Sequence, residues 1–149
     1  MILIDVNLLL YAYNADAPQH AAAKRWIEEI FGGDEIVALP WMTLWGFVRL
    51  STNPRVWPSP MKAEDAFEIV RSWLAQPGVT VVEPGPRHFD LLQRMVIECQ
   101  AAGRMVSDAV LAALALEHGA TLATSDHDFK RFSDVRLINP LAPKGETRA

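Results

Sequence analysis

Short apolar segments alternate with helical segments along the whole chain, and this alternation limits the possible folds more than any other feature. Five segments have the length and composition of buried strands: 1–6, 35–40, 79–84, 120–124 and 135–139. Helical spacing or a nearly continuous apolar composition marks the segments between them: 7–14, 18–33, 41–52, 62–78, 87–103 and 107–119. Such alternation is typical of parallel sheets covered by helices on both faces. We therefore predict a three-layer α/β/α fold with a mostly parallel sheet of roughly five strands.

The length of the chain fits one such domain. Its 149 residues, of which 50% are hydrophobic, can form one core, and no repeat or linker divides them. We predict a single domain over 1–141 and a polar tail over 142–149. The apolar run at 109–116 is far shorter than the ~20 residues of a membrane span, and no secretory signal is recognisable. Cys99 is the only cysteine, which is typical of a cytoplasmic protein without disulfides.

Aspartates stand where two of the predicted strands end. Asp5 directly follows the first strand, and Asp126 comes two residues after the fourth. Asp108 is predicted in the first turn of the helix that leads into the fourth strand, with Ser107 as its N-cap and a favourable helix dipole. Parallel strands end at one edge of a sheet, and a helix that leads into a strand starts on that side. We therefore expect the three carboxylates to meet at one edge.

A cluster of carboxylates requires positive charge, because like charges repel and burial disfavours the charged form. The net charge is −4, from 14 Lys and Arg against 18 Asp and Glu. Removing Asp5, Asp108, Asp126 and Asp128 from the 18 leaves 14, so the acidity can be concentrated at this edge. Oxygen ligands without His or Cys favour Mg²⁺, with Mn²⁺ as a substitute. Such an ion serves phosphoryl chemistry.

Structural roles compete with this interpretation at several of these residues. Asp108 can simply favour a helix start, and Asp126 and Asp128 can be turn and N-cap residues before "FKRF". Asp5 has the weakest structural explanation, since an unpaired carboxylate directly after "ILI" in a central strand is costly. His127, between the two aspartates, is interpreted as a solvent-facing turn residue.

Other conspicuous side chains receive structural interpretations. His20 and His88 are expected on helix surfaces. Five tryptophans are many for this length. Trp26 and Trp73 lie on apolar helix faces and are predicted to be in the core. Three more flank a proline-rich loop, where at least two are expected to be buried and the alternative is a partner surface; these are Trp41, Trp45 and Trp57.

The chain resembles a known family at the aspartates and beyond them. "MILIDVNLLLYAYN", "SDAVLAALALEHGATLATSDHDF" and "LINPL" are similar to the PIN-domain ribonucleases, specifically the VapC-type toxins of bacterial type II toxin–antitoxin systems. "TNPRV" and "VVEPGPRH" extend the resemblance over nearly the whole chain. It implies a PIN-like fold and a Mg²⁺-dependent endoribonuclease that cuts structured RNA, such as tRNA or rRNA. It also implies neutralisation by a VapB-type antitoxin and a homodimer.

The resemblance assigns roles to individual residues. Asp5, Asp108 and Asp126 match the family's catalytic, metal-binding acids, and Asp128 matches a further metal-site aspartate of many members. Asn7 matches a polar residue that would orient Asp5 or a water molecule, although an N-cap role for the next helix is equally plausible.

One position departs from the family pattern. Many members carry a glutamate in the helix after the second strand, where this chain has Gly46. No acid lies between Glu35 and Glu64, and Glu35 opens its strand and so belongs to the opposite edge of the sheet. The number of metal ions, one or two, is therefore left open.

RNA binding also requires cations for the phosphates. The candidates near helix or loop ends are Arg49, Arg55, Arg104, Lys130 and Arg131. Two other functions remain open: a catalytically weakened PIN module that acts by binding RNA or an antitoxin, and a phosphoryl-transfer α/β domain. The latter fits less well, because haloacid dehalogenases have a second aspartate where this chain has Asn7, and no lysine follows the fourth strand directly.

Overall fold

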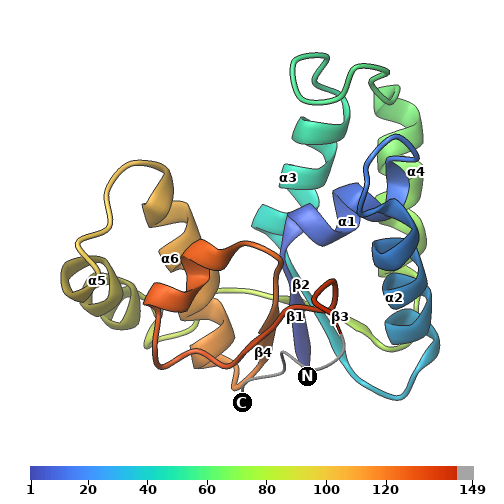
Figure 1. Cartoon of the computed structure of the whole chain (residues 1–149). Helices are drawn as coiled ribbons and strands as arrows, with labels where there is room; N and C mark the ends of the chain where they lie inside the picture. The colour runs from blue at the N-terminus through green and yellow to red at the C-terminus, as the bar shows by residue number, and fades with distance from the viewer. Residues whose placement is uncertain (144–149) are drawn as a thin grey trace.

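The computed structural model describes residues 1–143 and contains one sheet between two layers of helices (Figure 1). Every pair of neighbouring strands is parallel, in the order β3-β2-β1-β4-β5. The strands are β1 (Ile2–Ile4), β2 (Val37–Pro40), β3 (Val79–Val82), β4 (Thr121–Ala123) and β5 (Leu137–Ile138). The predicted α/β/α architecture is confirmed. Of the predicted tail, all but 142–143 lies outside the described residues.

Six α-helices and one 3₁₀ helix are present among residues 1–143. They are α1 (Val6–Tyr13), α2 (His20–Gly32), α3 (Trp41–Ser51), α4 (Ala63–Leu74), α5 (His88–Glu98), α6 (Arg104–Glu117) and the 3₁₀ helix η1 (His127–Arg131). Helices α1 to α4 lie on one side of the sheet, and α5 and α6 lie on the other (Figure 1). No helix in this part of the chain has the length and apolar character needed to cross a bilayer.

Alternating side chains of the central strands supply the two cores. Leu3 of β1 joins the cluster under α5 and α6, whereas Ile4 joins the cluster under α1 to α4. Ala38 and Leu39 of β2 divide in the same way. Successive side chains of a strand point to opposite faces, so a strand covered on both faces is apolar throughout. This explains why the central strands show continuous apolar sequence.

The start of α6 differs from the prediction. The helix begins at Arg104 rather than at Ser107, after Gly103, whose φ of 58° is in the left-handed region that glycine adopts without strain. Asp108 therefore lies in the second turn, where the helix dipole stabilises a carboxylate less than in the first turn. Helix α5 ends at Glu98, five residues before the predicted end, because Gln100 has a φ of 51°.

The prediction that at least two of Trp41, Trp45 and Trp57 are buried is wrong. Only Trp57 is buried, while Trp41 and Trp45 on α3 are exposed by 38% and 67%. Trp73 is in the core as predicted, and Trp26 packs against the core while remaining partly exposed. Apolar composition alone does not indicate which side of a short helix faces the sheet, and α3 is apolar nearly all round.

The prediction for His88 is also wrong. It starts α5 but is 8% exposed, and its Nδ1 lies 3.7 Å from Oε2 of Glu117 on α6. The burial follows from packing between two helices that are far apart in the sequence. His20 is partly buried, and its Nδ1 lies 2.9 Å from the Tyr11 carbonyl oxygen.

Candidate active site

Asp5 occupies the junction between β1 and α1. It precedes α1 in an extended conformation, and its side chain is buried, with the residue 6% exposed. Its backbone N–H donates to the Ala123 carbonyl at the end of β4. The Thr43 hydroxyl of α3 donates to the carbonyl of Ile4, 3.1 Å away. The backbone at Asp5 is thus held by the neighbouring strand β4 and by helix α3.

Thr124 connects the ends of β1 and β4. Its buried hydroxyl donates to Oδ2 of Asp5 at 2.7 Å and accepts from the backbone N–H of Asp126 at 3.0 Å. One hydroxyl therefore fixes the orientation of the first carboxylate and the position of the third. The sequence analysis did not identify Thr124, because a threonine at a strand end is ordinary strand composition. Its position two residues before Asp126, typical of a hydroxyl-containing turn, was the available signal.

The electrostatics show that three of the predicted acids share one region. The pKa of Asp5 is raised to about 6, mainly by burial and in part by repulsion from Asp108 and Asp126. The hydrogen bonds from Thr124 and from the backbone of Asn7 oppose this rise. Burial also raises the pKa of Asp108, followed by repulsion from Asp126. These residues are separated by up to 121 positions, from Asp5 to Asp126, yet their charges act on one another. The expected convergence at one edge is present.

Asp126 and Asp128 also have the structural roles considered from the sequence. Oδ1 of Asp126 accepts from the backbone N–H of Asp128 at 2.9 Å, which makes Asp126 the N-cap of η1. Oδ1 of Asp128 lies 3.7 Å from Nη2 of Arg131. Asp128 is exposed, and its charge raises the pKa of Asp108. It therefore lies at the outer side of the cluster.

The donor chemistry at this edge fits a hard divalent cation. Within residues 1–143, no group of three or more His, Cys, Asp or Glu side chains is arranged so that it could hold a metal ion. Asp5, Asp108 and Asp126 nevertheless supply only carboxylate oxygens, and the burial of Asp5 carries a cost that a bound cation would offset. Asp5 and Asp108 are the acids that could hold such an ion directly. One carboxylate oxygen of Asp126, Oδ1, accepts the hydrogen bond that caps η1, and the other oxygen remains available as a third metal ligand.

Gly46 stands where a further acid was considered. It is buried in α3, and a Cβ built there would lie 3.4 Å from Cγ2 of Val6, the residue after Asp5. The position therefore borders the site but contributes no oxygen. Glu35 bonds to the amino terminus at the start of β1, at the opposite edge of the sheet, as expected.

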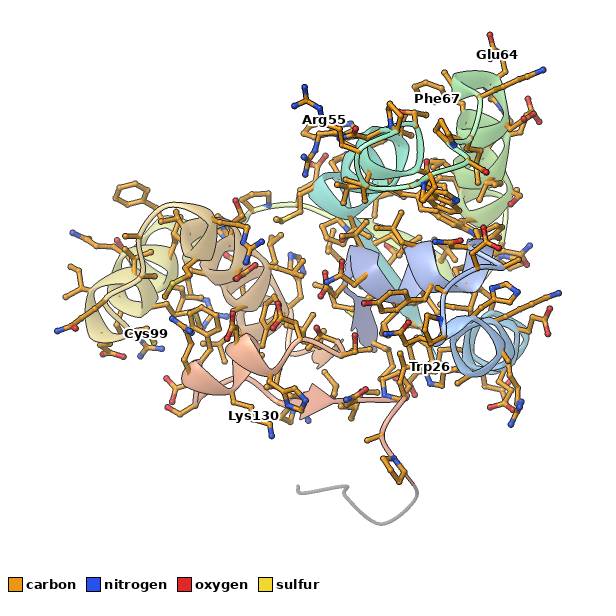
Figure 2. All side chains as sticks on the ribbon, turned by 45° about the horizontal axis from the view of Figure 1, so that its top comes forward. Trp26, Arg55, Glu64, Phe67, Cys99 and Lys130 are labelled. Carbon is orange, nitrogen blue, oxygen red and sulfur yellow. The ribbon has the colours of Figure 1, made fainter. Side chains whose placement is uncertain are left out.

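The predicted cations do not form one patch. Arg104 and Arg131 lower the pKa of Asp108, so both lie beside the acids. Arg49 is on α3 and Arg55 is in the loop after it. Figure 2 shows Arg55 far from Lys130, which lies on η1. His127 is exposed, in agreement with the predicted turn residue.

The comparison with known proteins decides the family. The PIN domain profile matches residues 2–135. The chain belongs to the PIN-domain family. Ribonuclease VapC25 of Mycobacterium tuberculosis is 40% identical to this PIN protein over 140 residues, which cover 94% of this chain and 99% of the relative. Ribonuclease VapC37 of the same organism is 40% identical over 142 residues, with 95% and 99% covered. The chain is therefore a PIN-domain protein of the VapC ribonuclease group.

Solved structures show the same fold at lower sequence identity. VapBC2 from Rickettsia felis, bound to a DNA fragment from its promoter, contains a chain with a TM-score of 0.70 and 18% identity, covering 93% of this PIN protein and 98% of that chain. VapC20 of Mycobacterium tuberculosis, described as a sarcin-ricin loop cleaving toxin, has a TM-score of 0.68 and 19% sequence identity. The match covers 91% of this PIN protein and 99% of the VapC20 chain. These matches confirm the PIN-like fold.

Proposed function

We propose that this VapC-type PIN protein is a Mg²⁺-dependent endoribonuclease toxin that cleaves structured RNA, such as tRNA or rRNA. The observation that carries the proposal is the convergence of Asp5, Asp108 and Asp126 at the carboxyl edge of the sheet. The charges of Asp108 and Asp126 raise the pKa of Asp5, and the charge of Asp126 raises the pKa of Asp108. The relatives named ribonucleases support the choice of RNA as the substrate. Mn²⁺ is a possible substitute ion.

The proposed reaction is in-line hydrolysis of a phosphodiester. A bound Mg²⁺ would supply charge to stabilise the phosphate oxygens and would lower the pKa of the attacking water. Asp5 and Asp108 would hold the ion, with Asp126 completing the ligands. Thr124 holds Asp5 in one orientation through its 2.7 Å hydrogen bond. Asp128 is exposed, and Asn7 lies in the first turn of α1, where its backbone bonds to Asp5 and where Asp5, rather than Asn7, is the N-cap. Both positions suit residues that hold water or orient the direct ligands.

The site favours one ion held by the protein. Gly46 supplies no carboxylate beside Val6, and Asp128 is paired with Arg131. A second ion, if the reaction uses one, would arrive with the substrate phosphates. The proposal also covers the residues that bind the RNA backbone: Arg104 and Arg131 lie closest to the acids, whereas Arg49, Arg55 and Lys130 would contact more distant phosphates.

The proposed partners follow from the relatives in toxin–antitoxin complexes. A VapB-type antitoxin would neutralise this protein, and the protein would act in the cytoplasm as a homodimer. Phe67 and Leu74 on α4 are exposed apolar side chains, by 57% and 39%, and offer area for protein contacts. Light scattering of the purified chain would give its oligomeric state, and a mainly monomeric protein at micromolar concentration would contradict the homodimer.

RNA cleavage by the purified protein tests the proposed function. With Mg²⁺, the wild-type protein should cleave total cellular RNA at defined positions, and EDTA should abolish cleavage. Asp5→Asn and Asp108→Asn should each lower the rate by about 10³-fold or more, because each removes charge that the transition state requires. Asp134→Asn is the matched control, since this exposed aspartate pairs with Arg94 away from the site.

The other outcomes separate the competing functions. Cleavage that persists in EDTA, or in both site variants, would contradict the metal mechanism. A folded protein that binds RNA but cleaves none would be a weakened PIN module, and a covalent phosphate on Asp5 after incubation with a phosphodonor would indicate phosphoryl transfer. Mapping of new RNA 5′ ends after brief expression would then identify the target.

A further inference from the structure

Two exposed tryptophans on α3 have no role in the cores or in the acidic cluster. Trp41 and Trp45 are one helical turn apart, and their rings are stacked, with centroids 6.1 Å apart and planes inclined by 24°. Trp45 is 67% exposed, so one face of the pair is open to a further ring. Exposed tryptophans are unfavourable in water, and a pair of them indicates a binding surface.

The pair is held in place before any ligand binds. Nε1 of Trp41 donates to Oε1 of Glu83, 3.1 Å away in the segment after β3. This bond fixes the plane of the first ring, and the second ring stacks on it. A fixed surface binds with less loss of conformational entropy than a mobile one. The Glu83 carboxylate also disfavours a phosphate at Trp41, so a base is the better occupant there.

The pair lies next to the catalytic carboxylates along the same edge of the sheet. Trp41 directly follows β2, which is paired with β1, and Asp5 directly follows β1. The Thr43 hydroxyl, between the two tryptophans in sequence, bonds to Ile4. Gly46, next to Trp45, faces Val6. Helix α3 therefore contacts the residues on both sides of Asp5, the backbone of Ile4 and the side chain of Val6.

The cations that follow Trp45 in the sequence fit a polyanion. Residues 36–63 contain no Asp or Glu but contain three cations, Arg49, Arg55 and Lys62, in a chain whose net charge is −4. Arg49 is one further turn along α3 from Trp45, and both are exposed. Arg55 follows in the loop beside α3 (Figure 2). Two rings followed by cations match the alternation of bases and phosphates in single-stranded RNA.

We propose that Trp41 and Trp45 form a stacking platform for unpaired bases of the RNA substrate, next to the phosphodiester that is cleaved. The inference deepens the proposed ribonuclease function and rests on it for the choice of RNA. The platform would select substrates in which the cleaved bond lies in a loop, because bases inside a duplex cannot stack on a protein ring. A protein partner on the same surface is the alternative, but the exposed cations Arg49 and Arg55, which follow the rings on α3 and in the next loop, favour the nucleic acid.

The test measures RNA binding without cleavage. The full chain carrying Asp5→Asn is titrated, with Mg²⁺ present, against a fluorescein-labelled single-stranded RNA of about 12 nucleotides. A second RNA has the same backbone but abasic central positions. Adding Trp45→Ala should weaken binding of the normal RNA by about 5- to 100-fold, and Trp45→Phe should weaken it less. Phe89→Ala is the control, since Phe89 is 73% exposed on α5.

The abasic RNA shows whether the contact is with bases. It should bind the Asp5→Asn parent more weakly than the normal RNA, and Trp45→Ala should remove this difference. Equal affinities of the parent and the Trp45→Ala variant for normal RNA would overturn the platform, as would no measurable binding by the parent. A change in oligomeric state with unchanged RNA affinity would overturn it in favour of a protein contact.

Failure of the inference and failure of the proposed function give different results. Cleavage by the wild-type protein without dependence of binding on Trp45 would reject only the platform. Binding that depends on Trp45, combined with no cleavage by the wild-type protein in Mg²⁺, would reject only the ribonuclease function.

Discussion

Two carboxylates in this protein, those of the buried Asp5 and the partly buried Glu117, have opposite electrostatic surroundings. Asp5 has one hydroxyl donor and two further acids near it, and its pKa is raised to about 6 by burial. Glu117 at the end of α6 accepts hydrogen bonds from the backbone N–H groups of Gly85 and Arg87, at 2.9 and 3.0 Å. Although burial alone would raise the pKa of Glu117, these bonds and the nearby histidines lower it.

The difference in surroundings indicates that the carboxylate of Glu117 stabilises the fold, whereas that of Asp5 is placed for function. Glu117 fastens the start of α5 to the end of α6, and its charge is satisfied within the protein. The charge of Asp5 is only partly satisfied, so its ionised form destabilises the fold and remains available to a cation. Unfavourable electrostatics in a buried site are an indication of function. Four substitutions sharpen the comparison.

Asp5→Asn should stabilise the metal-free protein at neutral pH. A folded-state pKa raised from 3.8 to about 6 contributes stability that is fully present below about pH 4 and is lost as the pH rises through 6. In EDTA, the variant should be more stable than wild type by about 3 kcal/mol at pH 8, and the gap should close near pH 4. Urea unfolding at both pH values measures this. A variant that is less stable than wild type at pH 8 would contradict the account of Asp5.

Glu117→Gln should destabilise the protein, the opposite of the effect of Asp5→Asn. The two carboxylate oxygens of Glu117 each accept a backbone hydrogen bond. In the glutamine side chain, one of these oxygens becomes a neutral and weaker acceptor, and the other becomes an NH₂ group that has no acceptor there. We expect a loss of about 2 kcal/mol at pH 7. Because the folded-state pKa is lowered, this contribution is present above the unfolded-state pKa and disappears as the pH falls through the folded-state pKa. The same urea experiment tests it, and an increase in stability at pH 7 would remove the contrast.

Thr124→Val should impair catalysis more than folding. Loss of the hydroxyl frees Oδ2 of Asp5 and the Asp126 backbone, so kcat/KM should fall by about 10- to 100-fold. The hydrogen bond lowers the pKa of Asp5, so the acid limb of the pH–rate profile should also move to higher pH. Thr124→Ser keeps the hydroxyl and is the control. Equal rates and pH profiles for the Val and Ser variants would show that Thr124 does not position Asp5.

Gly46→Ala should have the smallest effect and touches neither carboxylate. Alanine raises the helix propensity of α3, and its Cβ would meet Val6 at 3.4 Å, the short limit of an ordinary contact. We expect an unchanged cleavage rate and a gain in stability of about 0.5–1 kcal/mol. Thermal unfolding and the cleavage assay measure the two quantities. A large loss of activity would mean that the site does not tolerate a side chain at position 46, which would contradict this prediction.

The sequence predicts the fold and the cluster of acids at one edge of the sheet, because both follow from two kinds of information. These are the local patterns of strands and helices and the rule that parallel strands end at the same edge. Asp5 and Asp126 follow apolar strands, and the carboxyl ends of parallel strands share an edge. Asp108 is placed on the correct side although its helix begins three residues earlier than predicted, since the turn at Gly103 has no strong N-cap signal.

Features that depend on contacts between distant segments are not predicted. The bonds from Gly85 and Arg87 to Glu117 span 30 or more positions, and nothing local marks His88 as buried beside them. Trp41 is exposed because the opposite side of α3 packs on the sheet, which an apolar sequence does not specify. These contacts require tertiary structure to be recognised.

The most direct test of the central claim, that distant acids at one edge of the sheet bind a single hard cation, uses paramagnetic Mn²⁺ at substoichiometric concentration. Amide NMR signals of Asp5, Asp108 and Asp126 should broaden together, excess Mg²⁺ should restore them, and the signal of Glu117 should persist. Asp5→Asn should abolish the joint broadening. Broadening confined to one of the three, or unchanged by Asp5→Asn, would contradict the claim.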